Sequence, residues 1–336
     1  MRYWISLIPA ILLGILLSAS VNANSSACLE CHENLTKNEY VHYPSGDTKC
    51  EICHSAKPQH LSSQRKEDVS TDRSNDVCYN CHQPMDSSPV VHGALQKKDS
   101  CIFCHNPHAS TRRSFLRAEP SKLCVSCHTT LIPAGTTQHG AIDLKRSCLN
   151  CHLPHSSITP KLLTAQGGNC MSCHENGMVG VPNMAKEFSD FPLSHKPVKD
   201  GKCTSCHTPH ASSFEPLLRN EASSAKPNWN ENLVEICLQC HGAMVSGILV
   251  SNNETRFRSD AVVNGKTVRR NLHFLHVVVK GRACTVCHDV HGGSNPHNIA
   301  SDASSRKTRK FAFSVTPMGG SCARACHGNA NYNRMN

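Results

Sequence analysis

The sequence predicts a mostly irregular chain with short α-helices, built from repeated units around a core that is not aliphatic. Only 38% of its 336 residues are hydrophobic and 5% are aromatic, although a chain of this length can bury a large core. It carries 22 Cys and 23 His, far above ordinary usage. These counts exclude an ordinary cytosolic globular enzyme. They also argue against a disordered chain, because such chains are not rich in Cys and His.

The N-terminus carries the features of a secretory signal. Arg2 precedes an apolar run over Ile5–Leu17, and Val21-Asn22-Ala23 offers a cleavage site. The run is shorter than the roughly 20 residues of a spanning helix. We therefore expect a cleaved signal over residues 1–23 and an exported mature chain over residues 24–336. No lipobox Leu precedes the first cysteine, so no lipid anchor is expected there. No later segment is long and apolar enough to span a bilayer, so no membrane span is expected after cleavage.

The cysteines form eleven pairs. Ten pairs lie in the string C-x-x-C-H, and the eleventh has one extra residue between its cysteines. All 22 cysteines are used, so none is left for a disulfide. The pairs are Cys28 and Cys31, Cys50 and Cys53, Cys78 and Cys81, Cys101 and Cys104, Cys124 and Cys127, Cys148 and Cys151, Cys170 and Cys173, Cys203 and Cys206, Cys237 and Cys240, Cys284 and Cys287, and Cys322 and Cys326.

C-x-x-C-H is the attachment signature of c-type haem. Two cysteines about one helical turn apart can bond the two vinyl groups on one porphyrin edge, and the adjacent His then reaches the iron. A zinc site, a thioredoxin-like dithiol or a disulfide does not require a His after every second Cys. The sequence therefore predicts eleven covalent haem c groups. The expected proximal ligands are His32, His54, His82, His105, His128, His152, His174, His207, His241, His288 and His327.

Twelve histidines remain as candidate distal ligands, one more than eleven haems need. They are His42, His60, His92, His108, His139, His155, His195, His210, His273, His276, His291 and His297. Five of them, at 42, 92, 139, 195 and 276, lie eight or nine residues before an even-numbered motif. Four, at 108, 155, 210 and 291, follow a proximal His by three residues, too few to reach the opposite face of the same haem. Each of these four must therefore bind a different haem.

The even-numbered motifs recur every 47 to 55 residues, with one longer step of 81, which indicates a repeat of two haems. Similar strings follow them, such as Ser114-Phe115-Leu116, Pro160-Lys161-Leu162-Leu163 and Pro216-Leu217-Leu218. From its first motif to its last, the chain resembles multihaem cytochromes with a doubled C-x-x-C-H motif. These include cytochrome c3-like carriers and the periplasmic decahaem subunits of outer-membrane porin–cytochrome conduits. Eleven sites and a stretched last motif depart from that pattern.

The resemblance implies that each upstream His serves the haem of the motif that follows it. His42, His92, His139, His195 and His276 would then serve the motifs that begin at residues 50, 101, 148, 203 and 284. By count, the remaining ligands point backward. His60, His108, His155, His210 and His291 would serve the haems of His32, His82, His128, His174 and His241. The last haem takes His297 or His273, and we favour His297, with His273 the spare.

The expected fold is an extended multihaem cytochrome in which a haem stack forms the core, since about 28 mature residues accompany each haem. Each C-x-x-C-H should begin or end a short helix. One β-hairpin is expected near residues 256–270, because Asn264-Gly265 is typical of a tight hairpin turn. Polar linkers are expected at Ser62–Asp76 and Asn298–Lys310.

The polypeptide has a formal charge of +10. Eleven ferric haems with ionised propionates each add −1, so the oxidised holoprotein is near neutrality. The basic run Arg306–Lys310 could suggest nucleic acid, but Lys and Arg mostly offset the cofactor charge, and no nucleic-acid partner is expected.

Two His ligands saturate an iron, and such haems pass single electrons. We expect an electron carrier of anaerobic respiration rather than an enzyme, periplasmic or else secreted. Its partners would be an inner-membrane quinol-linked donor and an outer-membrane or extracellular acceptor. The alternatives are a multihaem reductase with an open iron at His327 and a structural cytochrome subunit of a larger enzyme.

Overall fold

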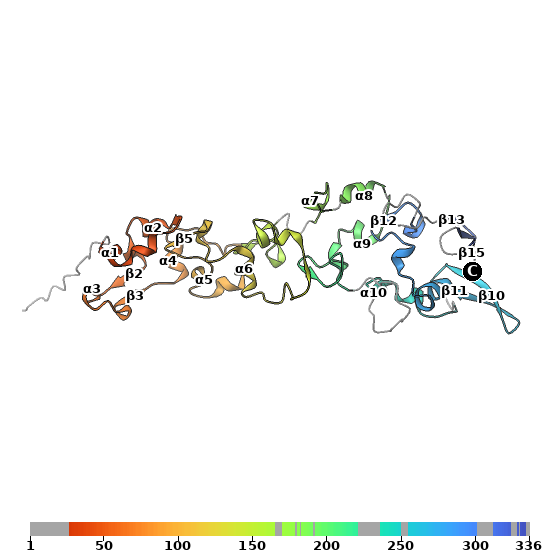
Figure 1. The fold of residues 1–336 in the computed structure, drawn as a ribbon, viewed down its shortest axis with the longest axis horizontal. Coiled ribbons are helices and arrows are strands. Elements are labelled where there is room, and N and C mark those ends of the chain that lie inside the picture. The colour runs from red at the N-terminus through yellow and green to blue at the C-terminus, as the bar shows by residue number, and fades with distance from the viewer. Residues whose placement is uncertain are drawn as a thin grey trace, which may run out of the picture. The chain divides into compact units, whose positions relative to one another are not determined.

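The structure is a computed structural model of the chain, and it consists of short helices, turns and short strands (Figure 1). It describes residues 27–164, 170–178, 180–181, 183–190, 192–220, 236–249, 255–300, 312–323, 328 and 330–333. The expected signal over residues 1–23, Cys326, His327 and most of the second linker lie outside these residues. Within the described ranges, no helix has the length and apolarity that crossing a bilayer requires.

The chain forms two compact units, and the first comprises residues 27–87 and 91–119 of the described chain. Its α-helices are α1 (Cys28–His32), α2 (Tyr43–Gly46), α3 (His60–Ser63), α4 (Asn75–Tyr79) and α5 (Cys101–Cys104). Its 3₁₀ helices are η2 (Glu33–Thr36), η3 (Cys50–Ile52), η4 (Lys66–Asp68), η5 (Gly93–Gln96) and η6 (Arg113–Phe115). Its strands are β1 (Tyr40–Val41), β2 (His54–Ala56), β3 (Val69–Thr71) and β5 (Ala109–Ser110), and β4 covers Val90–Val91.

The second unit comprises residues 88–90 and the described residues from 120 onward. Its α-helices are α6 (Pro120–Val125), α7 (Met171–His174), α8 (Met184–Asp190), α9 (Lys196–Lys199) and α10 (Leu238–His241). Its 3₁₀ helices are η7 (Gly140–Ile142), η8 (Ser147–Asn150), η9 (Pro160–Leu162), η10 (Cys203–Ser205), η11 (Gly242–Val245), η13 (Cys284–Val286) and η14 (Pro296–Asn298), and η12 (Phe274–Val279) is a π-helix. Its strands are β6 (Thr137–Gln138), β7 (Ser156–Ser157), β8 (Leu193–Ser194), β9 (Ala211–Ser212), β10 (Arg258–Val263), β11 (Lys266–Asn271), β12 (Gly292–Gly293), β13 (Ala312–Thr316), β14 (Gly319–Ala323) and β15 (Ala330–Asn333).

Very short antiparallel strand pairs tie each repeat to the next. In the first unit β1 pairs with β5, and in the second unit β6 pairs with β9 and β8 with β12. Each pair joins the strand just before an upstream His to the strand just after a C-x-x-C-H-x-x-H string. The backbone N–H of His42 donates to the His108 carbonyl oxygen at 2.8 Å, and His139 bonds His210 in the same way at 2.7 Å. Sequence-distant histidines therefore share one backbone contact.

A loop with the same geometry follows four of the even-numbered motifs. Its turn holds a residue at left-handed φ in three of them, namely Ser114 at 55°, Lys161 at 60° and His297 at 60°. Pro216 occupies the equivalent position in the fourth. The predicted repeat therefore extends to a fourth string, Pro296 to Ile299.

The predicted hairpin is present as β10 and β11, with Asn264 and Gly265 both at positive φ in its turn. It belongs to a larger sheet in the order β11-β10-β15-β14-β13, with every described pairing antiparallel. The three C-terminal strands were not expected. Cys322 lies on β14, so the last motif begins on a strand and departs from the helix expected for every motif.

The prediction of a linker at Ser62–Asp76 is wrong, because this segment forms regular secondary structure. It holds the end of α3, all of η4 and β3, and the start of α4. β3 pairs with β2 in register Ser55↔Ser70, and the Asp68 carboxylate accepts hydrogen bonds from Ser63 Oγ at 2.6 Å and Gln59 Nε2 at 3.2 Å. The segment is thus a hairpin arm that holds α3 in place.

The described residues contain very little aliphatic core. Their buried apolar side chains are Ala109, Val245, Leu272 and Ala300. Large apolar side chains lie exposed inside or beside the motifs, including Ile52 at 42%, Phe103 at 44% and Leu153 at 40%. Apolar surface of this kind favours burial against another apolar group.

Candidate functional site

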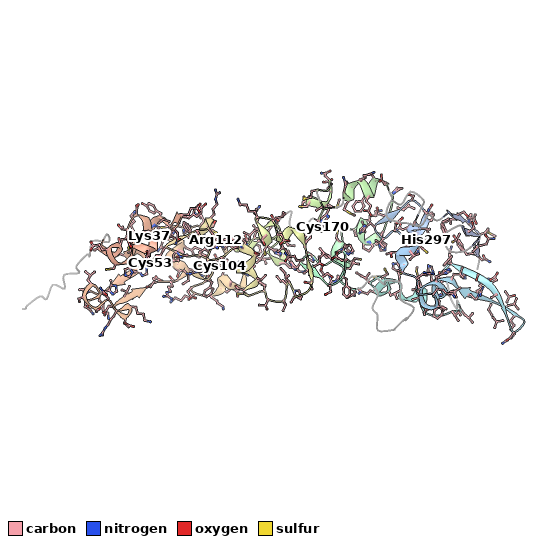
Figure 2. The ribbon with its side chains drawn as sticks, in the orientation of Figure 1. Lys37, Cys53, Cys104, Arg112, Cys170 and His297 are labelled. Atoms are coloured by element: carbon pink, nitrogen blue, oxygen red, sulfur yellow. The ribbon has the colours of Figure 1, made fainter. Side chains whose placement is uncertain are left out.

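Each described C-x-x-C-H motif of the regular type closes one helical turn. In most of these motifs the backbone N–H of the motif His donates to the carbonyl oxygen of the first Cys, as in His82 to Cys78 at 2.9 Å and His207 to Cys203 at 3.0 Å. The turn places both thiols and the imidazole on one short element, as covalent attachment at a porphyrin edge requires. Figure 2 labels Cys53 and Cys104 on the first unit and Cys170 on the second.

Eight pairs of imidazole rings face one another across a nearly constant distance in the described chain. Each pair joins one motif His to one His outside the motifs. The ring centroids are separated by 6.3 Å for His32 and His60, 5.9 Å for His42 and His82, 5.9 Å for His54 and His108, 6.2 Å for His139 and His174, 6.1 Å for His152 and His210, 6.0 Å for His195 and His241, 6.1 Å for His207 and His291, and 6.3 Å for His273 and His288.

Of the predicted partners, His60 is found where the sequence placed it, opposite His32. The upstream histidines are not. His42, His139 and His195 were expected to serve His54, His152 and His207, but they face His82, His174 and His241. Each upstream His thus reaches the odd-numbered motif that follows its own even-numbered one.

The backward assignments also shift. His108, His210 and His291 were expected opposite His82, His174 and His241, but they face His54, His152 and His207. The short strand pairs are the physical reason. They place His42 and His108 side by side, so the two rings must diverge to different motifs, one forward and one backward. The pairings expected for His92 and His155 remain predictions.

The C-terminal assignments differ as well. His276 was expected to serve His288, and His273 was the spare. The structure instead places His273 opposite His288, while the His276 ring packs against Phe257 at 5.7 Å. His276 lies on the π-helix η12 and His273 directly precedes it, and the wider turn of a π-helix changes which side chains share a face. His276 and His297 are both candidates for the last motif, since His327 is outside the described residues.

Hydrogen bonds at Nδ1 fix the orientation of many of these rings. Proximal His105, His152, His207 and His288 bond the carbonyl oxygens of Ser114, Lys161, Pro216 and His297 at 2.6 to 3.0 Å. Distal His42 and His60 bond the carbonyl oxygens of Pro107 and Arg65. An Nδ1–H that donates to oxygen leaves Nε2 unprotonated, and this tautomer is the one that binds a metal through Nε2.

Burial also favours the neutral, metal-binding form of the imidazoles. It lowers the pKa of His273 to about 4, with the neighbouring His288 adding to the effect. Burial likewise lowers the pKa values of His54, His108, His174, His195, His207 and His210. A neutral imidazole keeps its Nε2 lone pair near neutral pH.

Thiols of consecutive motifs lie beside one another. Burial and the adjacent Cys101 thiol together raise the pKa of Cys78 to about 11, and burial and the Cys203 thiol raise that of Cys170 to about 11. Burial and the neighbouring Cys28 raise the pKa of Cys50. The attachment cysteines of consecutive motifs therefore lie close together in space within each unit.

The paired rings fit the iron of a haem. Two imidazoles whose nitrogens each lie about 2 Å from one metal ion, on opposite sides, have centroids about 6 Å apart. The observed 5.9 to 6.3 Å agrees with that value, and the two thiols beside each proximal His supply the covalent attachment. The carbonyl oxygens that accept the Nδ1 hydrogen bonds could not be predicted from the sequence, because every residue type has a backbone carbonyl.

The family described as doubled CXXCH motif matches residues 92–132, 139–179 and 195–246. The matched motifs indicate a multihaem c-type cytochrome. The same motifs indicate covalently bound haem c, and bound haem c implies a role in electron transfer. A search of curated proteins finds no match to the chain.

Proposed function

We propose that this multihaem cytochrome carries electrons along a series of eleven haems, each held by two histidines. The observation that carries the proposal is the set of imidazole pairs at 5.9 to 6.3 Å, each with one ring from a C-x-x-C-H motif. Bound haem supplies reversible one-electron chemistry at its iron. The chain attaches the group through its thiols, and orients both imidazoles through their Nδ1 hydrogen bonds.

The haems also replace the missing core. The few buried apolar side chains among the described residues cannot stabilise a chain of this length, and exposed Ile52, Phe103 and Leu153 offer apolar surface beside the motifs. Porphyrin faces would cover that surface. The neighbouring thiols of consecutive motifs, such as Cys78 and Cys101, support closely spaced haems within each unit.

The setting that we propose is anaerobic respiration outside the cytoplasm. Haem c attachment is typical of exported chains, and the expected signal over residues 1–23 agrees with export. We place the protein in the periplasm, with secretion as the alternative. Its partners would be an inner-membrane quinol-linked donor and an outer-membrane or extracellular acceptor, as in the porin–cytochrome conduits that the sequence resembles.

Spectroscopy of the oxidised protein tests the proposal. A carrier whose irons all have two His ligands shows only low-spin ferric haem and accepts one electron per haem. The purified, fully reduced protein should return its electrons to an added iron oxide. A ferric protein with high-spin haem at several sites would contradict it.

A reductase is the second candidate, and one observation favours it. The last motif differs from the others, because its cysteines are spaced further apart and Cys322 lies on strand β14 rather than on a helical turn. An open iron at that haem would appear as a high-spin fraction of about one haem in eleven, together with turnover of a small oxyanion such as nitrite or sulfite.

A further inference from the structure

One distal histidine hydrogen-bonds a carboxylate. The Nδ1 of His291 and Glu187 Oε1 are 3.0 Å apart, although 104 residues separate the two in sequence. The contact is shielded from solvent, since the side chains of His291 and Glu187 are 23% and 12% exposed. Hydrogen bonds to an ionised acceptor are shorter and about twice as strong as neutral ones.

Glu187 comes from an insertion in its repeat. His174 and the next upstream His, His195, are 21 residues apart, whereas the equivalent spacings after His82 and His128 are 10 and 11. The additional residues form α8. The helix is anchored at its start, where the Asn183 side chain accepts a hydrogen bond from the Lys186 backbone N–H at 2.7 Å.

Neutral acceptors occupy the corresponding place in the other described Nδ1 contacts. His207, the ring opposite His291, bonds the Pro216 carbonyl oxygen at 3.0 Å. His152, opposite His210, bonds the Lys161 carbonyl oxygen at 2.9 Å. His273 bonds the Thr255 hydroxyl at 2.7 Å. The carboxylate therefore distinguishes the His207 and His291 pair from otherwise similar sites.

We propose that Glu187 lowers the reduction potential of the haem attached to Cys203 and Cys206. This rests on the proposed ligation of that haem by His207 and His291. A carboxylate that accepts the Nδ1–H makes the imidazole more basic and places a negative charge near the iron. Both effects stabilise ferric over ferrous iron, because the ferric centre carries one more positive charge. Glu187 is a positioning residue that acts through His291, and it makes this haem harder to reduce than the haem of His152 and His210.

The test compares two charge-removing substitutions on α8. Glu187→Gln keeps a hydrogen-bond acceptor and removes the charge. Asp190→Asn removes the same charge from an exposed side chain that pairs with Lys186 at 2.9 Å. Reduction of the full-length holoprotein is followed by electron paramagnetic resonance during a redox titration, after intact mass has confirmed the haem content. Glu187→Asp, which keeps the charge on a shorter side chain, is the second variant.

Glu187→Gln should move one haem in about eleven to a higher midpoint potential and shift its low-spin ferric signal. Glu187→Asp should give a smaller upward shift, and Asp190→Asn none. In the His291→Met background, Glu187→Gln should add nothing further. Equal shifts in Glu187→Gln and Asp190→Asn, or no shift in Glu187→Gln, would overturn the proposal. If His291→Met itself left every haem signal unchanged, the failure would lie with the proposed ligation instead.

Discussion

His42 and His108 share a backbone hydrogen bond of 2.8 Å, yet their imidazole rings face different motifs. His42 faces His82, and His108 faces His54. A single two-residue strand pair, β1 with β5, therefore sends one ligand forward along the chain and the other backward. The same arrangement recurs where β6 pairs with β9 and β8 with β12.

His42→Met should give His/Met ligation at the haem of Cys78 and Cys81, and raise the potential of that haem, because Met is a weaker donor to ferric iron than His. The new His/Met absorption should disappear when Cys78 and Cys81 are both replaced by Ala. It should persist when Cys50 and Cys53 are replaced instead, and the opposite result would restore the assignment expected from the sequence.

His60→Ala should open one iron. The His60 ring lies parallel to that of His32, with 1° between the planes, and its Nδ1 is held by the Arg65 carbonyl oxygen at 3.0 Å. Without that imidazole, the haem of Cys28 and Cys31 keeps only its proximal ligand. The reduced variant should bind about one carbon monoxide per chain, measured by optical titration. The unsubstituted protein provides the control, and equal binding by both proteins would argue against His60 as a ligand.

The number of haems can be counted by intact mass. The mature chain should exceed the processed polypeptide by eleven haem masses, because all eleven motifs carry two cysteines and a His. Cys322→Ser with Cys326→Ser should remove one of them. A native mass with ten haems, unchanged in that double variant, would show that the stretched motif does not take up haem.

The distal ligand of the last haem can be assigned by comparing two histidines. We expect it to be His276, whose Nδ1 is held by the Leu272 carbonyl oxygen at 2.7 Å. Its ring packs against Phe257, which contacts Tyr332 on β15, the neighbour of the strand that carries Cys322.

His297 has a backbone role instead. It occupies the turn position of Ser114 and Lys161, and its carbonyl oxygen accepts the hydrogen bond of His288 Nδ1 at 2.9 Å. His276→Met should therefore create one His/Met haem, and His297→Met none. The reverse pattern would return the assignment to His297.

Local features were predictable from the sequence because they depend on adjacent residues. C-x-x-C-H closes one turn by itself, and Asn264-Gly265 provides the two positive φ angles of the hairpin. His60 reaches His32 through a short arm of its own repeat. In each case the information lies within about thirty residues.

The ligand register was not predictable, because it depends on contacts between repeats. Strands of two residues, such as β1 and β5, are too short to show a periodic pattern. The first of the three C-terminal strands, β13, did carry a signal. Phe313 and Val315 alternate with polar residues before the turn at Pro317, and this pattern indicates a strand.

The backward reach of His291 to His207 has a consequence for the damaged protein. A fragment that ends between Leu218 and His291 keeps the motif of His207 but lacks the imidazole opposite it. The iron there would gain a vacant position that oxygen or peroxide can occupy. Proteolysis would thus convert an inert carrier into a source of oxidative chemistry, so clipped molecules would be recognisable by their peroxidase activity.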